Sequence, residues 1–373
     1  MFSERTSVGL DVHARSVTAA ALDGVTGEVW QVRLRPDVAA ILEWVQSLPP
    51  PVAVAYEAGP TGFGLVRALT AGGVRCVVAA PSKLQRPSGD RVKTDMRDAQ
   101  HLCRLLRLDE VTAVSVPSVA QESARDLVRA REDCRGDLMR ARHRLSKLLL
   151  RHGHVYLLGE RGQAWSLAHD QWLRRVRRDG DWPVGAGSAF DDCYESVVAV
   201  TARRNRLDTQ IAVMAANSEF TPVVRRLGCL RGISTLTGFG LAVEIGDWHR
   251  FTGKTIGAFV GLTPTEHSSG QSRHVGSIGK TGNSHARRLL VEAAWHHRPQ
   301  YRPGKTMQDR WALAPSAARL RGDAGNRRLH RQWVRFIARH KRGTVATIAI
   351  ARELAGWCWS LATIDDTDVT AMT

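Results

Sequence analysis

Several features that would assign a protein class directly are missing from this 373-residue sequence. Its six cysteines form no CxxC pair and no His/Cys cluster at zinc-finger spacing, which argues against a zinc-finger protein and favours reduced thiols. No apolar run reaches the roughly 18 residues that could span a bilayer, and the first residues lack a signal-peptide core. We therefore expect a folded cytoplasmic protein, associated with the nucleoid if it acts on DNA.

Acidic residues are too few to balance the basic ones. Lysine and arginine total 53 against 36 aspartates and glutamates, which gives a formal net charge of +17. Residues 221–373 alone hold 23 basic and 10 acidic side chains, so most of the excess belongs to the last part of the chain. Such a charge favours a polyanionic partner, with nucleic acid as the first candidate. A hydrophobic content of 43% is enough for two or three packed units.

The first hundred residues have the pattern of a mixed α/β domain. Apolar stretches at residues 8–12, 17–22 and 29–34 predict three antiparallel strands. After them the pattern alternates between helix and strand, with helices over residues 38–48 and 63–69 and strands over residues 52–56 and 74–79. Three meandering strands followed by alternating elements is the order of an RNase H-like sheet.

Four acids occupy positions in this domain where a metal-dependent nuclease would hold its ligands. Asp11 lies within a strand, Glu57 ends another, and Asp95 and Asp98 share a face if their segment is helical. Two divalent ions roughly 4 Å apart need carboxylates that converge from different elements, one ion activating the nucleophile and the other the leaving oxygen. Oxygen ligands without an imidazole cluster favour Mg²⁺ or Mn²⁺.

Taken singly, three of these acids have ordinary explanations. Glu57 precedes a Gly-Pro turn and could begin it, while Asp95 and Asp98 beside Lys93 and Arg97 could form a solvated helix face. Asp11 is harder to explain without function, because burying an unpaired carboxylate in an apolar strand is costly.

The middle of the chain predicts a helical hairpin. Apolar positions alternate steps of four and three from Cys134 to Leu148, and again from Phe190 to Met214, interrupted only by Arg204. These coiled-coil-like series could pair within one chain or between chains. Residues 151–188, between them, are too irregular to assign, and His152 and His154 are expected in a loop.

The last segment has features suited to a nucleic-acid backbone. The pattern over residues 227–246 resembles a helix-hairpin-helix, whose turn amides hold a phosphate, with Ser234 where such motifs often have glycine. A serine- and glycine-rich segment follows, in which Ser269 could be a nucleophile or merely part of a turn. Side chains expected to contact nucleic acid flank it and the acids: Arg273, Lys280, Asn283, Arg287, Arg288, Lys93 and Arg97.

Taken in order, these motifs resemble the DEDD transposases of bacterial insertion sequences, the insertion-sequence one-ten family, to which the Piv-type invertases are related. The segments that carry the resemblance are Gly9-Leu10-Asp11, Glu57-Ala58-Gly59-Pro60-Thr61-Gly62, Lys93-Thr94-Asp95-Met96-Arg97-Asp98-Ala99, Gly261-Leu262-Thr263-Pro264, Ser268-Ser269-Gly270 and Lys280-Thr281-Gly282-Asn283.

The resemblance implies a RuvC-like catalytic domain over residues 1–115 carrying the four acids. It further implies a coiled-coil hairpin with an inserted tip over 116–222, and a mainly helical transposase domain over 223–373. By motif position Ser269, directly before Gly270, is the nucleophile, although Ser268 offers a second hydroxyl. Members of the family act as oligomers, dimers or tetramers, on donor and target DNA and are guided by a noncoding bridge RNA.

Three hypotheses follow. The chain is a recombinase that forms a phosphoserine bond to DNA, a RuvC-like junction nuclease that uses activated water, or a nucleic-acid-binding scaffold without catalysis. The acids and the serine together motivate the first, the acids alone the second, and the charge and helices the third.

Overall fold

The computed structural model describes residues 4–84, 94–156, 163–269 and 272–364. The chain divides into two compact units, Met1–Ser118 and Val119–Thr373. Among the described residues no helix is both long and apolar enough to cross a membrane.

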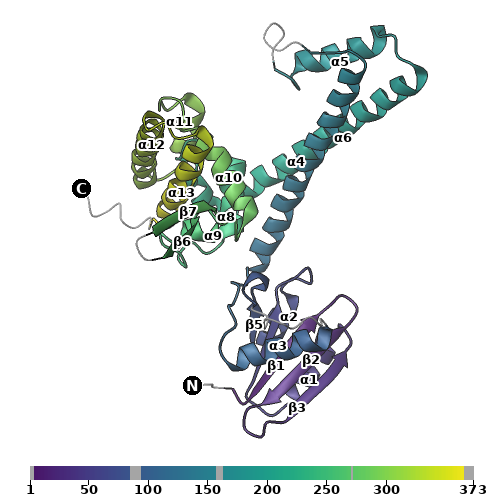
Figure 1. Ribbon diagram of the computed structural model, residues 1–373, viewed down its shortest axis with the longest axis vertical. Coiled ribbons are helices and arrows are strands. Elements are labelled where there is room, and N and C mark those ends of the chain that lie inside the picture. Colours follow the sequence, from purple (N-terminus) through teal and green to yellow (C-terminus); the bar gives the residue numbers. More distant parts are fainter. Residues whose placement is uncertain (1–3, 85–93, 157–162, 270–271, 365–373) are drawn as a thin grey trace. The chain divides into compact units, whose positions relative to one another are not determined.

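The first unit is built on a five-stranded mixed sheet with strand order β3-β2-β1-β4-β5 (Figure 1). β1 pairs antiparallel with β2 and parallel with β4, so it is central, and β4 pairs parallel with β5. The strand bounds are β1 Thr6–Val12, β2 Val17–Asp23, β3 Val29–Leu34, β4 Val52–Glu57 and β5 Arg75–Ala79. This mixed α/β arrangement is consistent with the predicted RNase H-like domain, and all five predicted strands are present.

The helices of the first unit are α1 Val38–Gln46, α2 Gly64–Ala71 and α3 Asp95–Arg107, with a short 3₁₀ turn at Pro81–Lys83. Ile41 of α1 and Leu69 of α2 belong to one buried cluster with Val8 and Leu10 of β1. α3 packs against β1, β2 and β4, and its Leu106 is buried with Ala53 and Ala55. The predicted segment with Asp95 and Asp98 is therefore helical.

The second unit contains two long helices, α4 Val119–Arg151 and α6 Val184–Ala216, that pack against each other (Figure 1). They are antiparallel, because Arg131 pairs with Asp208 and Arg203 pairs with Asp137. Apolar side chains of the two predicted series point inward in this pairing, including Leu145 and Phe190. The series therefore meet within one chain.

A helix that the sequence pattern did not predict, α5 Leu167–Asp179, lies between the two long helices in sequence. Trp172 and Leu173 of α5 pack into the same cluster as α4 and α6. The arginine-rich run 174–178, left unassigned from sequence, is on this helix. His152 and His154 follow the end of α4, and their rings contact Trp182.

The remainder of the second unit is mostly helical around one core that includes Leu230, Ile256, Leu290 and Ile350. Its helices are α7 Thr221–Leu227, α8 Thr235–Ile245, α9 Ile256–Phe259, α10 Ser284–Trp295, α11 Lys305–Ala312, α12 Ser316–Ala338 and α13 Gly343–Ala362. The serine- and glycine-rich segment, expected as a loop, is instead an antiparallel hairpin of β6 Pro264–Ser269 and β7 Ser272–Ile278.

Candidate active site

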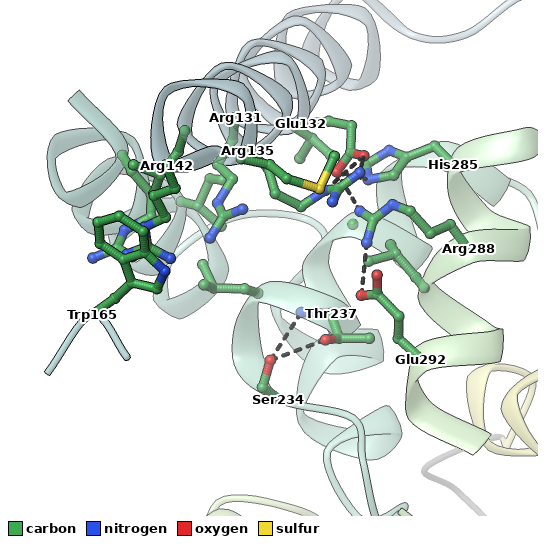
Figure 2. A pocket seen from close by; sticks show the side chains of 18 of the residues that line it. Arg131, Glu132, Arg135, Arg142, Trp165, Ser234, Thr237, His285, Arg288 and Glu292 are labelled. Atoms are coloured by element: carbon green, nitrogen blue, oxygen red, sulfur yellow. Dashed lines mark hydrogen bonds and ion pairs between the residues drawn. The ribbon is translucent and has the colours of Figure 1, made fainter. Parts of the chain in front are cut away.

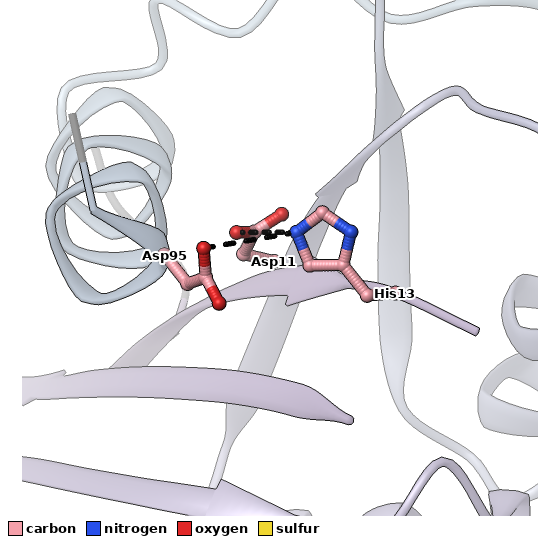
Figure 3. A group of neighbouring side chains, drawn as sticks. All are labelled: Asp11, His13 and Asp95. Carbon is pink, nitrogen blue, oxygen red and sulfur yellow. Dashed lines mark hydrogen bonds and ion pairs between the residues drawn. The ribbon is translucent and has the colours of Figure 1, made fainter. Parts of the chain in front are cut away.

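An acidic cluster lies at the carboxyl end of the central strand. Asp11 near the end of β1, His13 just beyond it and Asp95 at the start of α3 offer ligand atoms within 4.8 Å of one another (Figure 3). His13 Nε2 is 3.1 Å from Asp11 Oδ2 and 3.9 Å from Asp95 Oδ1. Two of the four predicted acids are thereby brought together.

Local sequence explains why α3 starts beside Asp11. Thr94 caps the helix, its hydroxyl accepting a hydrogen bond from the Arg97 amide, so the helix begins at Asp95. Gly9 lets α3 approach β1 closely, because a Cβ there would lie 2.1 Å from the carbonyl oxygen of Ala99. The glycine two residues before Asp11 is thus part of the site's architecture.

The other two acids lie near this cluster but outside it. Glu57 is exposed at the end of β4, and the preceding Tyr56 pairs with Leu10 of β1, so Glu57 and Asp11 end neighbouring parallel strands at one edge. Asp98, one turn along α3 from Asp95, is half-buried, and its charge acts on Asp11. Glu57 and Asp98 are therefore neighbours of Asp11, but they do not belong to the group formed by Asp11, His13 and Asp95.

The electrostatics at Asp11 favour an added cation. Burial raises the pKa of its carboxyl, as do the nearby charges of Asp95 and Asp98, while His13 opposes the rise. A half-buried carboxylate with two acidic neighbours is costly to ionise unless a positive charge joins them. The oxygen-rich donor set fits a hard divalent ion such as Mg²⁺ or Mn²⁺, and the single imidazole does not exclude it.

His13 was missed by the sequence reasoning, although a signal was available. Residues two apart on an extended segment point to the same face, so His13 follows Asp11 onto the same side of the sheet. The pattern Asp-x-His at a strand end could have suggested this placement. His13 is 57% exposed, which leaves it accessible to a substrate.

Ser269 is the last residue of β6 in the second unit. It is exposed and pairs across the hairpin with Ser272. Gly270, the basis for choosing Ser269 by motif position, lies outside the described residues. Ser268 and Arg273 form the neighbouring pair of the ladder.

Several predicted nucleic-acid contacts have structural partners of their own. The Asn283 side chain caps α10 through the Ala286 amide, and Arg287 donates to the carbonyl oxygens of Val260 and Thr281 at 3.0 Å. Arg288 forms ion pairs with Glu132 and Glu292.

The remaining predicted contacts are exposed or not described. Lys280 is exposed, with a positive φ of 54° beyond β7. Arg97 is exposed on α3, and Lys93 lies outside the described residues.

A buried acid in the second unit was not singled out from sequence. Glu244 of α8 is 2% exposed and accepts hydrogen bonds from Asn283 at 2.8 Å and from Arg129 and His285 at 3.2 Å. Burial alone would raise its pKa, but the bonds from His285, Arg129 and Asn283 outweigh it and lower the pKa to about 2. Glu244 therefore has a structural role: its bonds to Arg129 of α4 and to Asn283 and His285 at the start of α10 connect these helices to α8.

Comparison with known proteins accounts for both units. A profile of DEDD transposases of the IS110 type matches residues 8–153, and one described as the transposase IS116/IS110/IS902 family matches residues 224–311. A putative transposase of Sinorhizobium fredii is 36% identical over 95% of this chain and 88% of its own length. The transposase for insertion sequence element IS1533 of Leptospira borgpetersenii is 29% identical over 90% of this chain and 97% of its own length.

These matches span the acidic cluster at one end and the helices around Glu244 at the other, and they confirm the resemblance seen in the motifs. A transposase acts on DNA, which agrees with the excess of basic residues. The chain belongs to the IS110 family of DEDD transposases, enzymes that cut DNA.

Proposed function

We propose that this transposase cuts and rejoins DNA through a phosphoserine intermediate on Ser269, with divalent cations held by Asp11, Glu57, Asp95 and Asp98. The observation that carries the proposal is the convergence of Asp11 and Asp95 from a strand and a helix. The exposed position of Ser269 at the end of β6 supports its role as the attacking alcohol.

The chemistry assigns each group a task. Ser269 Oγ attacks the scissile phosphorus, the bond from phosphorus to the neighbouring sugar oxygen breaks, and that oxygen leaves with a proton. The serine loses its own proton to a base during attack, because a neutral hydroxyl is a weak nucleophile. Magnesium or manganese ions, when bound, would supply positive charge to the phosphate oxygens and to the attacking and leaving oxygens.

Rejoining is the reverse of this attack. A sugar hydroxyl attacks the phosphoserine, the bond to Ser269 Oγ breaks, and the serine recovers its proton. The phosphoserine bond conserves the energy of the phosphodiester, so rejoining requires no nucleotide hydrolysis, and the sequence has no Walker-type motif. Guidance by a noncoding bridge RNA, and assembly as a dimer or tetramer, complete the proposal and derive from the family resemblance.

The test is a search for a covalent adduct. The purified chain, its RNA, labelled donor and target DNA and Mg²⁺ should give a protein–DNA band that survives denaturation and is lost on adding EDTA. Ser269→Ala should abolish the band and recombination, whereas Ser272→Ala, its cross-strand neighbour, should retain both. Recombination by Ser269→Ala at the normal rate would reject Ser269 as the nucleophile, and loss in Ser268→Ala alone would move the nucleophile by one residue.

A RuvC-like junction nuclease is the second candidate, because the acidic cluster lies within the first unit alone. Activated water would then attack, and the cleaved DNA would carry no protein. The same assay separates the two functions, since metal-dependent cleavage without an adduct and without sensitivity to Ser269→Ala supports the nuclease.

A further inference from the structure

The second unit has a pocket that the proposed chemistry does not use. It has a volume of about 580 Å³, within the roughly 300–1,000 Å³ of small-molecule sites. Side chains from α4, α6, α8 and α10 line it, together with Trp165 just before α5 (Figure 2). Five arginines and two glutamates are among the lining residues, so basic side chains outnumber acidic ones there.

Arg142 of α4 is the unbalanced charge in this pocket. Its guanidinium carbon is 5.0 Å from the centre of the Trp165 ring. Within the described residues it has no carboxylate at ion-pair distance, and its Nε is buried without a hydrogen-bond partner. Burial lowers the pKa of Arg142, and the nearby Arg204 lowers it further. A guanidinium withdrawn from water without an anion is unfavourable, so the site is suited to a negatively charged ligand.

Three neighbouring arginines of α4, unlike Arg142, have carboxylate partners among the described residues. Arg131 pairs with Asp208, Arg135 with Glu132, and Arg140 with Asp137. A carboxylate of α4 or of the facing α6 thus pairs with each of these three arginines.

The opposite wall adds polar groups without cancelling the charge at Arg142. Figure 2 shows Arg288 between Glu132 and Glu292 on the side away from Arg142 and Trp165. Hydroxyl groups of Ser234 and Thr237, 3.0 Å apart at the start of α8, form another part of the lining. The pocket therefore combines an aromatic face, a cation without an anion, and hydroxyl groups that can donate or accept.

We propose that this pocket binds an unpaired nucleotide of a single strand, with its phosphate on Arg142 and its base stacked on the face of the Trp165 ring that Arg142 does not cover. Stacking on aromatic side chains beside a cationic backbone contact is the general way in which single strands are bound. A base inside a duplex is already stacked and cannot enter a pocket without leaving the helix. The proposal does not depend on the serine mechanism, because none of these residues belongs to the acidic cluster or the β6–β7 hairpin.

The test measures binding of the full-length chain to fluorescent 12-nucleotide oligo(U), oligo(dT) and a blunt duplex by anisotropy at fixed salt. Trp165→Ala should weaken single-strand binding about tenfold and leave duplex binding within about twofold. Trp165→Tyr keeps an aromatic ring and should retain most of the affinity. Comparing the oligo(U) and oligo(dT) losses identifies which kind of strand the pocket takes.

Arg142→Gln should also weaken single-strand binding, and it should lower the slope of log affinity against log salt by about 0.7, the value for one phosphate contact with a single strand. Trp165→Ala should leave that slope unchanged. Arg140→Gln is the matched control, since it removes the same charge from an exposed position of α4 outside the pocket.

A second readout locates the nucleotide without relying on substitutions. An oligonucleotide with one thio-substituted base should form a photo-crosslink to the peptide that contains Trp165. Equal weakening of duplex and single strand by Trp165→Ala, affinities of both variants within twofold of the parent chain, or crosslinks confined to other peptides would overturn the proposal.

Discussion

Two carboxylates that are largely withdrawn from solvent, Asp11 in the first unit and Glu244 in the second, have opposite surroundings. Asp11 lies near two further acids and one histidine, and its pKa is raised by burial. Glu244 accepts hydrogen bonds from an arginine, a histidine and an asparagine, and its pKa is lowered to about 2. The difference separates an acid whose charge is opposed by burial and by neighbouring acids from an acid whose partners are supplied by the fold.

The largest expected effect is that of Asp11→Asn on DNA cutting. Loss of the central carboxylate should reduce the rate of strand cleavage by about a thousandfold or more, while thermal stability is unchanged or slightly higher, because a costly buried charge is removed. Gel assays of cleavage and calorimetry of the same preparations measure both quantities.

Asp23→Asn is the matched control for this prediction. Asp23 is buried on the neighbouring strand, but it is paired with Arg5 at 2.7 Å and accepts from the Val25 amide. Its substitution should lower stability and spare cleavage at a permissive temperature. If the Asp11→Asn chain cleaved DNA at the parent rate, Asp11 would not be needed for cleavage, and its difference from Glu244 would have no functional meaning.

Glu244→Ala should destabilise the second unit by about 1–3 kcal/mol, because it removes the buried acceptor of the hydrogen bonds from Asn283, His285 and the exposed Arg129. Urea unfolding of the full-length chain measures the loss. Glu292→Ala removes an exposed partner of Arg288 and should change the free energy of unfolding by no more than about 1 kcal/mol. Equal effects of the two substitutions would show that burial of the pair is irrelevant.

Acid should weaken the second unit through the same residue. The folded-state pKa of Glu244 is about 2, below its ordinary value of 4.5, so the unfolded chain takes up the proton first as the pH falls. The stabilisation is complete above about pH 4.5 and is lost as the pH falls through about 2, with a magnitude on the order of 3 kcal/mol. Free energies of unfolding between pH 7 and pH 3 should fall less steeply in Glu244→Gln than in the parent chain, and parallel curves would contradict the assignment.

The smallest effect is expected for His13. Its ring nitrogen lies 3.1 Å from Asp11, where it can orient the carboxylate. His13→Ala should lower cleavage about tenfold, in the range found for groups that hold a metal ligand in place. His13→Gln, whose amide can donate to Asp11, should recover part of the loss. Cleavage by His13→Ala at the parent rate would show that His13 has no role in cleavage and that only the acids of the cluster do.

Sequence patterns predicted the first unit well because its signals are local. Alternating apolar residues define β1 to β3, and the spacing of Asp95 and Asp98 predicts one helical face, which α3 confirms. Neither the strand pattern nor the helix spacing requires knowledge of which distant segments are in contact.

Apart from His13 in the first unit, the features that were missed lie in the second unit and depend on contacts between distant parts of the chain. In the sequence Glu244 is a single acidic residue in a mostly apolar helix. Its partners Arg129 and His285 lie 115 and 41 residues away, so the sequence pattern does not show that they meet. The β6–β7 hairpin is rich in serine and glycine, which resemble a loop until the pairing of Ser269 with Ser272 is seen. The strong arginine content of α5 obscured its buried face at Trp172.

The two paired helices of the second unit are more than twice as long as the average helix of a globular protein. Each has 33 residues, which corresponds to a rod about 50 Å long at 1.5 Å per residue. Arginine–aspartate bridges between α4 and α6 brace this rod at Asp208 and Asp137. Because α5 packs at one end of this rod and α7 and α8 pack at the other, the paired helices join two separate hydrophobic clusters of the second unit.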